Sequence, residues 1–155
     1  MPKLLTFAYR FAAGSLLGAQ LFFVLIATRI VFRPEVAALP QGDPRRLWAA
    51  DTVGQMLGSL DRAALGGCAL AVLCAVLLAR AGVPRALRAA LPPLLAGLCA
   101  AASSALVTPA IHSLREAGQT ASPQFGRLHG LSSGLLLLEI ALLLLAVWRA
   151  PRAEG

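Results

Sequence analysis

The chain alternates between long apolar stretches and short polar connections that contain most of its arginines. The apolar stretches cover about residues 11–32, 60–79, 89–111 and 124–148. A helix of about 20 apolar residues crosses the hydrocarbon core of a bilayer, and arginines flank these stretches as they flank membrane anchors. The pattern therefore predicts four transmembrane helices in one integral membrane domain, residues 1–155.

A further helix is expected between the first two spans, over about residues 44–59. Asp43 and Pro44 form a helix start, because aspartate caps free backbone N–H groups and proline suits the first helical position. The apolar residues that follow recur at spacings of mostly three and four: Leu47, Val53, Met56, Leu57 and Leu60. This spacing predicts an amphipathic helix that either lies at the membrane interface or leads straight into the second span. The expected fold class is an all-α membrane protein, a bundle of four transmembrane helices with an amphipathic interfacial helix between the first and second.

Small residues recur at helical spacing in three of the predicted spans. They are Gly14 and Gly18 in the first span, Ala63, Gly67, Ala71 and Ala75 in the second, and Gly126, Gly130 and Gly134 in the fourth. Small residues let helix backbones approach closely within a membrane. We expect the glycines of the fourth span to edge a polar face that points into the bundle. Gly and Ala faces are also the surfaces through which a membrane-protein partner or a second copy of the chain would bind.

The composition supports a membrane protein and argues against other classes. The chain is 58% hydrophobic and 14% charged, whereas soluble domains are about 45–50% apolar and about 25% charged. The net charge of +7 does not indicate nucleic-acid binding, because the arginines flank apolar stretches instead of forming a solvent-exposed patch. The three cysteines lie in apolar stretches without CxxC spacing, so we expect buried small side chains and no disulfide or zinc site.

Four spans place both termini on one side of the membrane, which we expect to be the cytoplasm. Lysine and arginine are equally numerous on the two sides, but the side of the termini carries them in much shorter segments. Positive residues in short segments favour the cytoplasmic side. A preference for alanine and arginine over isoleucine and lysine is typical of GC-rich bacterial genomes. We therefore expect a multi-pass protein of a bacterial inner membrane.

One acidic residue, Glu139, lies in the middle of the fourth apolar stretch. It follows His129 by ten residues, or about 15 Å along a helix, and Gln20 lies at a similar depth in the first span. A hydrogen bond between Gln20 and Glu139 is therefore geometrically possible. An intramembrane carboxyl group is a candidate proton carrier or cation ligand. The alternative interpretation is a protonated acid that bonds one amide and serves only to fix helix packing.

A second polar cluster is predicted on the membrane side opposite the termini. His112 leaves the third span where His129 enters the fourth, and five residues belong at similar depth: Thr108, Arg115, Ser132, Arg29 and Asp61. Two histidines suit a metal or haem, but a metal site usually needs more ligands, so we expect no metal and no cofactor. The main interpretation is structural, with His129 donating a hydrogen bond to a carbonyl of the third span that Pro109 leaves free. Binding of a polar ligand is the remaining alternative.

Catalysis has little support in the sequence. The GxSxG, HExxH, P-loop and dinucleotide-binding patterns do not occur. We therefore expect a protein that is not an enzyme and that has a structural or accessory role in a membrane assembly. The alternative function is a carrier or binder of a proton, small cation, metal or haem that uses Glu139, Gln20 and the two histidines.

Three segments of the chain resemble a known family. They are GAQLFFVLIATRIVF in the first span, TPAIHSLRE at the end of the third and FGRLHGLSSGLLLLE at the start of the fourth. They are similar to the transmembrane protein 205-like family, whose bacterial members are described as domain of unknown function 4149. The best-matching positions are Pro109, Arg115, Phe125, Leu128, His129 and Ser132. The family often has an asparagine near the position of Leu136, which this chain lacks. The resemblance implies a four-helix integral membrane protein of unsettled activity.

Overall fold

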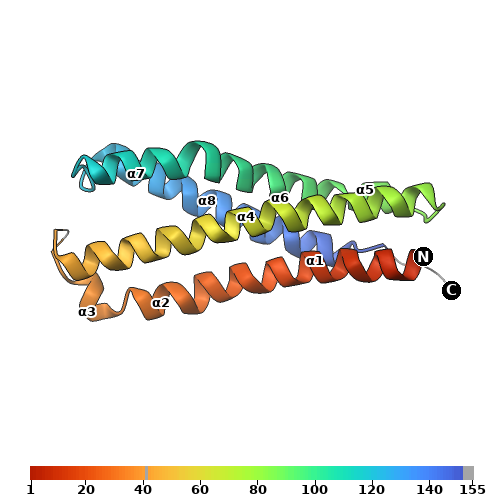
Figure 1. The fold of residues 1–155 in the computed structure, drawn as a ribbon, viewed down its shortest axis with the longest axis horizontal. Helices are drawn as coiled ribbons and strands as arrows, with labels where there is room; N and C mark the ends of the chain where they lie inside the picture. The colour runs from red at the N-terminus through yellow and green to blue at the C-terminus, as the bar shows by residue number, and fades with distance from the viewer. Residues whose placement is uncertain (41, 152–155) are drawn as a thin grey trace.

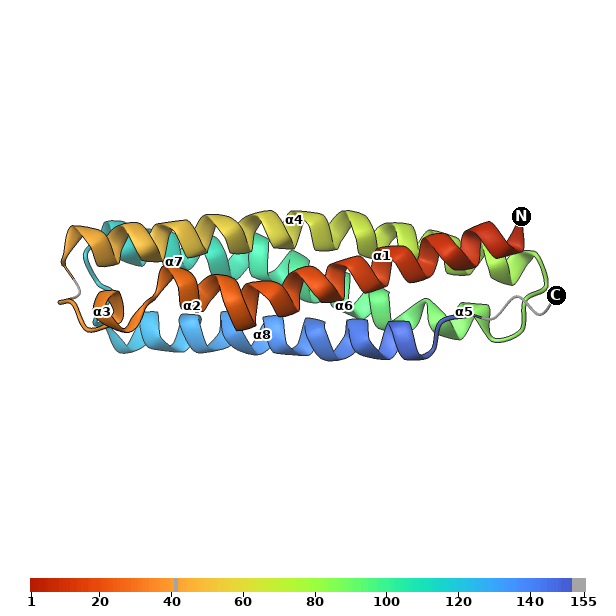
Figure 2. The ribbon, with the colours of Figure 1, turned by 90° about the horizontal axis from the view of Figure 1, so that it is seen from below.

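The computed structural model describes residues 1–40 and 42–151, and this part of the chain contains helices and turns but no strands. Figures 1 and 2 show an elongated bundle of long helices that run back and forth along one axis. The elements in chain order are α1 (Pro2–Phe22), the π-helical turn η1 (Phe23–Ala27), α2 (Thr28–Val31), α3 (Pro34–Ala37), α4 (Pro44–Arg80), α5 (Ala86–Ala89), α6 (Leu91–Ala102), the π-helical turn η2 (Ser103–Val107), α7 (Thr108–Glu116) and α8 (Pro123–Trp148).

Four helical segments are long and apolar enough to cross a membrane. They are Pro2–Val31, Pro44–Arg80, Ala86–Glu116 and Pro123–Trp148. The predicted all-α bundle of four transmembrane helices is therefore confirmed, and the chain is a multi-pass membrane protein. Many leucines on the outside of the bundle are exposed, as expected of side chains that contact the lipid bilayer instead of water.

The four segments pack in a ring. α1 contacts α4 and α8, and α6 contacts the same two helices from the other side. The start of α1 and the end of α8 lie at the same end of the bundle (Figures 1 and 2). We call the opposite end, where α3 and α7 lie, the distal end. A ring of four antiparallel neighbours leaves every span with one inward face, so polar residues on these faces can meet.

The predicted amphipathic helix leads straight into the second span. The segment 44–59 is the first part of α4, which continues without interruption to Arg80. Its 37 residues correspond to about 55 Å at about 1.5 Å per residue, compared with about 30 Å for the hydrocarbon core. The first turns of α4 therefore extend beyond the apolar layer at the distal end, and the segment is no separate interfacial helix.

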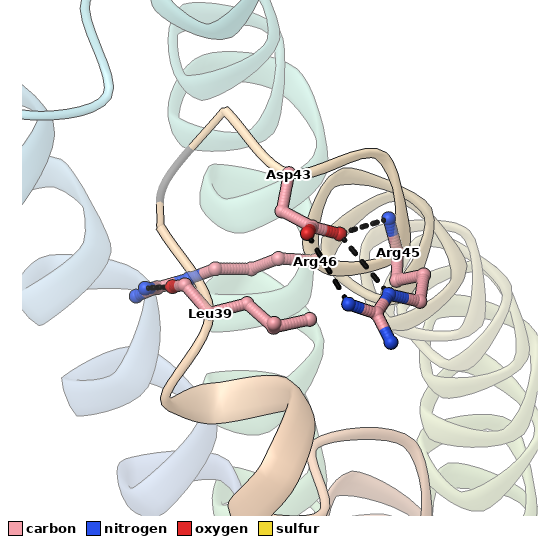
Figure 3. Close-up of polar contacts among 4 residues, drawn as sticks. All are labelled: Leu39, Asp43, Arg45 and Arg46. Carbon is pink, nitrogen blue, oxygen red and sulfur yellow. Dashed lines mark hydrogen bonds and ion pairs between the residues drawn. The ribbon is translucent and has the colours of Figure 1, made fainter.

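The start of α4 is capped as the sequence predicts. The Asp43 carboxylate accepts hydrogen bonds from the backbone N–H of Arg45 at 2.9 Å and from its guanidinium at 3.3 and 3.4 Å (Figure 3). The Arg45 side chain, with the backbone hydrogen bond, lowers the pKa of Asp43 below its ordinary value. Because the folded protein favours the charged form, the cap is retained above the ordinary pKa and is lost as the pH falls through the lowered value.

Tyr9 connects three helices by hydrogen bonds at the end of the bundle where the termini lie. The sequence analysis predicted no role for this residue. Its side chain is fully buried and its hydroxyl donates to the backbone oxygen of Ala89 at 2.7 Å, with Ala146 O 3.4 Å away. Tyr9 thus joins α1 to the start of the third span and the end of α8.

We expect Tyr9→Phe to lower the free energy of unfolding by about 1 kcal/mol, because the buried carbonyl of Ala89 loses its donor. The measurement is reversible unfolding in mixed detergent micelles. Phe7→Leu is the control, because Phe7 faces outward from the same helix. Equal stability of Tyr9→Phe and the unmodified protein would contradict the role of the hydroxyl.

Two glycines permit close helix contacts inside the bundle. A Cβ atom at Gly67 would lie 2.6 Å from Leu16 Cδ1, and one at Gly97 would lie 3.2 Å from Cys68 Cβ. Among the predicted glycine sets, only Gly67 has this role. The expectation that the fourth-span glycines edge an inward face is wrong, because Gly126, Gly130 and Gly134 are exposed.

Two π-helical turns interrupt the spans. In η2 the backbone N–H of Thr108 donates to Ser103 O, five residues earlier, directly before Pro109. Pro109 has no N–H to donate to the carbonyl of Ala105. The π-helical hydrogen bond therefore lies next to the residue that the sequence expects to leave a carbonyl of the third span free. η1 in the first span has the same pattern, from Thr28 N–H to Phe23 O. A π turn rotates the residues on either side of it relative to a regular helix, and such turns often occur at functional sites.

Candidate functional site

A layer of four polar side chains crosses the middle of the bundle, one from each span. The residues are Gln20 in α1, Asp61 in α4, Ser103 in η2 and Glu139 in α8. Each is at most 2% exposed, although the surrounding core consists largely of alanine, leucine and cysteine. We call these four residues the polar layer.

The contacts within the polar layer leave some oxygen atoms without a donor. Gln20 Nε2 donates to Glu139 Oε2 at 2.7 Å, which is the hydrogen bond that the sequence predicts. The Ser103 side chain hydrogen-bonds the Asp61 carboxyl group, and Asp61 and Glu139 are close enough to interact electrostatically. Gln20 Oε1 and Asp61 Oδ2 are buried without a hydrogen-bond partner. The layer therefore has acceptors that a proton, a water molecule or another donor would satisfy.

The position of Asp61 corrects one expectation. The sequence places Asp61 and Arg29 at the depth of the two histidines. Asp61 instead lies in the polar layer, Arg29 is exposed, and the described residues include no ion pair between them. Arg62 acts on Asp61 electrostatically without forming an ion pair. Asp61 therefore belongs with Glu139, not with the histidines.

Ser103 was not predicted as a site residue. Gly97, Ala101 and Ser104 recur at helical spacing on one face of the third span, but these residues are half-buried. The buried positions are one residue earlier: Ala96, Ala100, Ser103 and Val107. Their spacings of four, three and four fit a helix equally well. The same spacing rule could therefore have identified Ser103 as an inward residue.

Five of the seven residues predicted for the distal cluster line one cavity of about 770 Å³, and Arg29 and Asp61 do not. The five lining residues are Thr108, His112, Arg115, His129 and Ser132. The cavity lies between residues of the first span, the first half of α4, α7 and the first half of α8. Its volume is in the range of about 300–1,000 Å³ that is usual for ligand sites. Gln20 and Glu139, the other two predicted site residues, do not line it.

The inner end of the cavity approaches the polar layer. Three apolar lining residues each lie three or four positions from a layer residue on the same span: Phe23 from Gln20, Leu57 from Asp61 and Leu136 from Glu139. This separation is about one helical turn. The cavity thus ends one turn short of the two carboxyl groups, on the distal side.

The distal part of the cavity carries positive charge. Arg46 and Arg115 line it together with the two histidines, and the described lining includes no aspartate or glutamate. Arg46 donates to the backbone oxygen of Leu39, as Figure 3 shows. Arg115 Nη1 is buried without a hydrogen bond, and Asp51 Oδ1 lies 4.0 Å away.

The expected hydrogen bond from His129 to the third span is not present in the described part of the chain. Its ring instead stacks on Phe125 of the same helix, with the centroids 6.3 Å apart. The described residues include no group of three or more histidine, cysteine, aspartate or glutamate side chains that could hold a metal.

Comparisons with models of protein families, with curated proteins and with solved structures gave no match to this chain. The resemblance to the transmembrane protein 205-like family therefore stays a prediction.

Proposed function

We propose that this membrane protein is not an enzyme and that it carries protons through the carboxyl groups of Asp61 and Glu139. The observation that carries the proposal is the polar layer, to which all four spans contribute. An ionised carboxylate is costly in a membrane interior unless it is paired, and neither acid forms an ion pair among the described residues. Two neighbouring acids with few donors are suited to binding exchangeable protons.

A proton suits this arrangement better than a metal cation or haem. A metal ion would have to pass the positively charged part of the cavity, where Arg46 and Arg115 repel it. Protons can instead pass between water molecules and hydroxyl or imidazole groups, which Ser132 and His129 provide on the cavity wall. The inner end of the cavity lies one helical turn from Glu139, so hydration of the cavity would shorten the remaining path.

An accessory role in a membrane assembly is the second candidate, and the outward glycines favour it. Nothing lies within 4 Å of a Cβ atom built at Gly14, Gly18, Gly126, Gly130 or Gly134. These open surfaces would let a helix of another membrane protein, or of a second copy, approach closely. We also propose membership of the transmembrane protein 205-like family, a bacterial inner-membrane location and cytoplasmic termini. The resemblance and the distribution of basic residues support these assignments.

Proton transport is tested with the full chain in liposomes that contain a trapped pH-sensitive dye. A potassium diffusion potential drives protons, and the rate of internal pH change is measured. We expect the unmodified protein to raise this rate several-fold over protein-free vesicles. Glu139→Gln and Asp61→Asn should each return it to the protein-free level, because an amide cannot release a proton at neutral pH.

Glu116→Gln is the matched control, since Glu116 is an exposed acid at the distal end of α7. This variant should keep the full rate. Equal proton permeability of protein-containing and protein-free vesicles would overturn the proposal, as would full activity of Glu139→Gln. Circular dichroism of each reconstituted variant establishes that the helices are intact.

A further inference from the structure

We propose that the distal cavity binds a single-chain amphiphilic anion, with an aliphatic chain in the apolar inner part and a carboxylate or phosphate head at Arg115. The inference rests on the size, lining and charge of the cavity. Binding does not use Glu139 or Asp61, because neither residue lines the cavity, but a bound aliphatic chain would exclude water from the part of the cavity that the proposed proton path uses.

The inner part of the cavity suits an aliphatic chain. The wall formed by α4 extends from Arg46 to Leu57, which corresponds to about 16 Å along the helix. Most side chains over this length are apolar, including Val53 on α4 and Leu136 on α8. An apolar chamber of this depth is filled favourably by a chain that leaves water or the membrane interface.

Arg115 supplies a site for the anionic head. Its side chain is 20% exposed, and its Nη1 atom is buried without a hydrogen bond. The nearest acid does not satisfy it, because Asp51 Oδ1 is 4.0 Å from Nη1 while Asp51 Oδ2 accepts from Gln55 at 2.7 Å. A buried guanidinium N–H without an acceptor is costly, and the planar guanidinium matches carboxylate and phosphate oxygens.

A second arginine adds to the positive potential. Arg46 also lines the cavity, where it donates to the neutral carbonyl of Leu39 and forms no ion pair among the described residues (Figure 3). With two arginines and no described acid in the lining, a cationic head group would be repelled and an anionic one attracted. The cavity therefore selects for negative charge at its distal end and for apolar character further in.

The test measures saturable binding of radiolabelled dodecyl phosphate to the full chain in phosphatidylcholine nanodiscs, with empty nanodiscs subtracted. Three unlabelled competitors separate the contributions: dodecyl phosphate, dodecanol and inorganic phosphate. We expect dodecyl phosphate to compete at least tenfold better than dodecanol and than inorganic phosphate, because only it offers both head and chain. Equal competition by either of the other two would overturn the proposal.

Three variants of the cavity and one control locate the site. Arg115→Gln should weaken binding at least tenfold, Arg115→Lys should retain part of it, and Arg29→Gln should bind normally because Arg29 does not line the cavity. Val53→Trp should also weaken binding by filling the chamber, without any change of charge. Binding that is absent, or unchanged in both Arg115→Gln and Val53→Trp, would contradict the assignment.

The same chemistry can come from the bilayer or from a free amphiphile. Nanodiscs that contain phosphatidylglycerol distinguish these sources. Loss of labelled dodecyl phosphate in such discs would show that a two-chain anionic lipid occupies the site and would overturn the single-chain assignment, whereas unchanged binding supports a free single-chain anion. Glu139→Gln should bind dodecyl phosphate normally, so failure of the proton proposal would not affect this result.

Discussion

Replacing Gly67 by leucine should lower the free energy of unfolding by about 1–3 kcal/mol, the usual cost of overpacking a filled interior. Even the first carbon of the new side chain would lie 2.6 Å from Cδ1 and 3.0 Å from Cγ of Leu16. Leu16 is a buried residue of α1 and belongs to the same hydrophobic core cluster as Ala64, Cys68 and Leu143. The two helices would therefore have to separate, which would open the packing around the polar layer.

The neighbouring residue provides a matched control. Gly66 is on the same helix but exposed, and nothing lies within 4 Å of a Cβ atom built there. Gly66→Leu should therefore change the free energy of unfolding by less than about 0.5 kcal/mol, as for other surface substitutions. Reversible unfolding of both variants in mixed micelles measures the difference. Similar destabilisation by both would mean that leucine acts through the lipid environment and not through Leu16, because helix propensity favours leucine over glycine.

The fold could be predicted because long apolar stretches with flanking arginines are easily recognised in a sequence. Four apolar stretches with arginine flanks and short connections determine the number of spans and their antiparallel order. A cap residue placed the start of α4 at Asp43, which accepts a hydrogen bond from the first turn of that helix. The inward face of each span was harder to predict. Residues that contact lipid and residues in the core are both apolar, so hydropathy does not distinguish them.

Site residues could be predicted where a polar side chain is unusual in an apolar span. They could not be predicted where the rotation or the starting point of a helix determines which side chain points inward. Glu139 and Gln20 are unusual inside apolar spans, so an estimate of depth was enough to pair them, at 2.7 Å in the structure. Ser103 is one of two adjacent serines, and the choice between them depends on the rotation of the third span. Asp61 lies near the boundary of a predicted span, but α4 begins so much earlier that this residue is well inside the bundle.

Asp61→Asn should raise the free energy of unfolding by about 1–2 kcal/mol, because an uncompensated buried charge costs more than a buried neutral amide. Asp61 Oδ2 has no hydrogen-bond partner, and the residue lies close to a second buried acid, Glu139. The amide has the same shape and cannot ionise, so it removes the electrostatic conflict between the two side chains. Unfolding in mixed micelles at neutral pH tests the expected gain.

Gln20→Leu should have the opposite effect, because it removes the amide that donates to Glu139. Ser104→Ala is the control with little expected change, since this hydroxyl bonds only the Ala101 carbonyl of its own helix. An acid that lowers stability is retained when activity requires it, so a more stable Asp61→Asn protein that no longer transports protons would place Asp61 in the transport path. A less stable Asp61→Asn protein would instead show that the polar layer holds the four helices together. That result would favour the accessory role over proton transport.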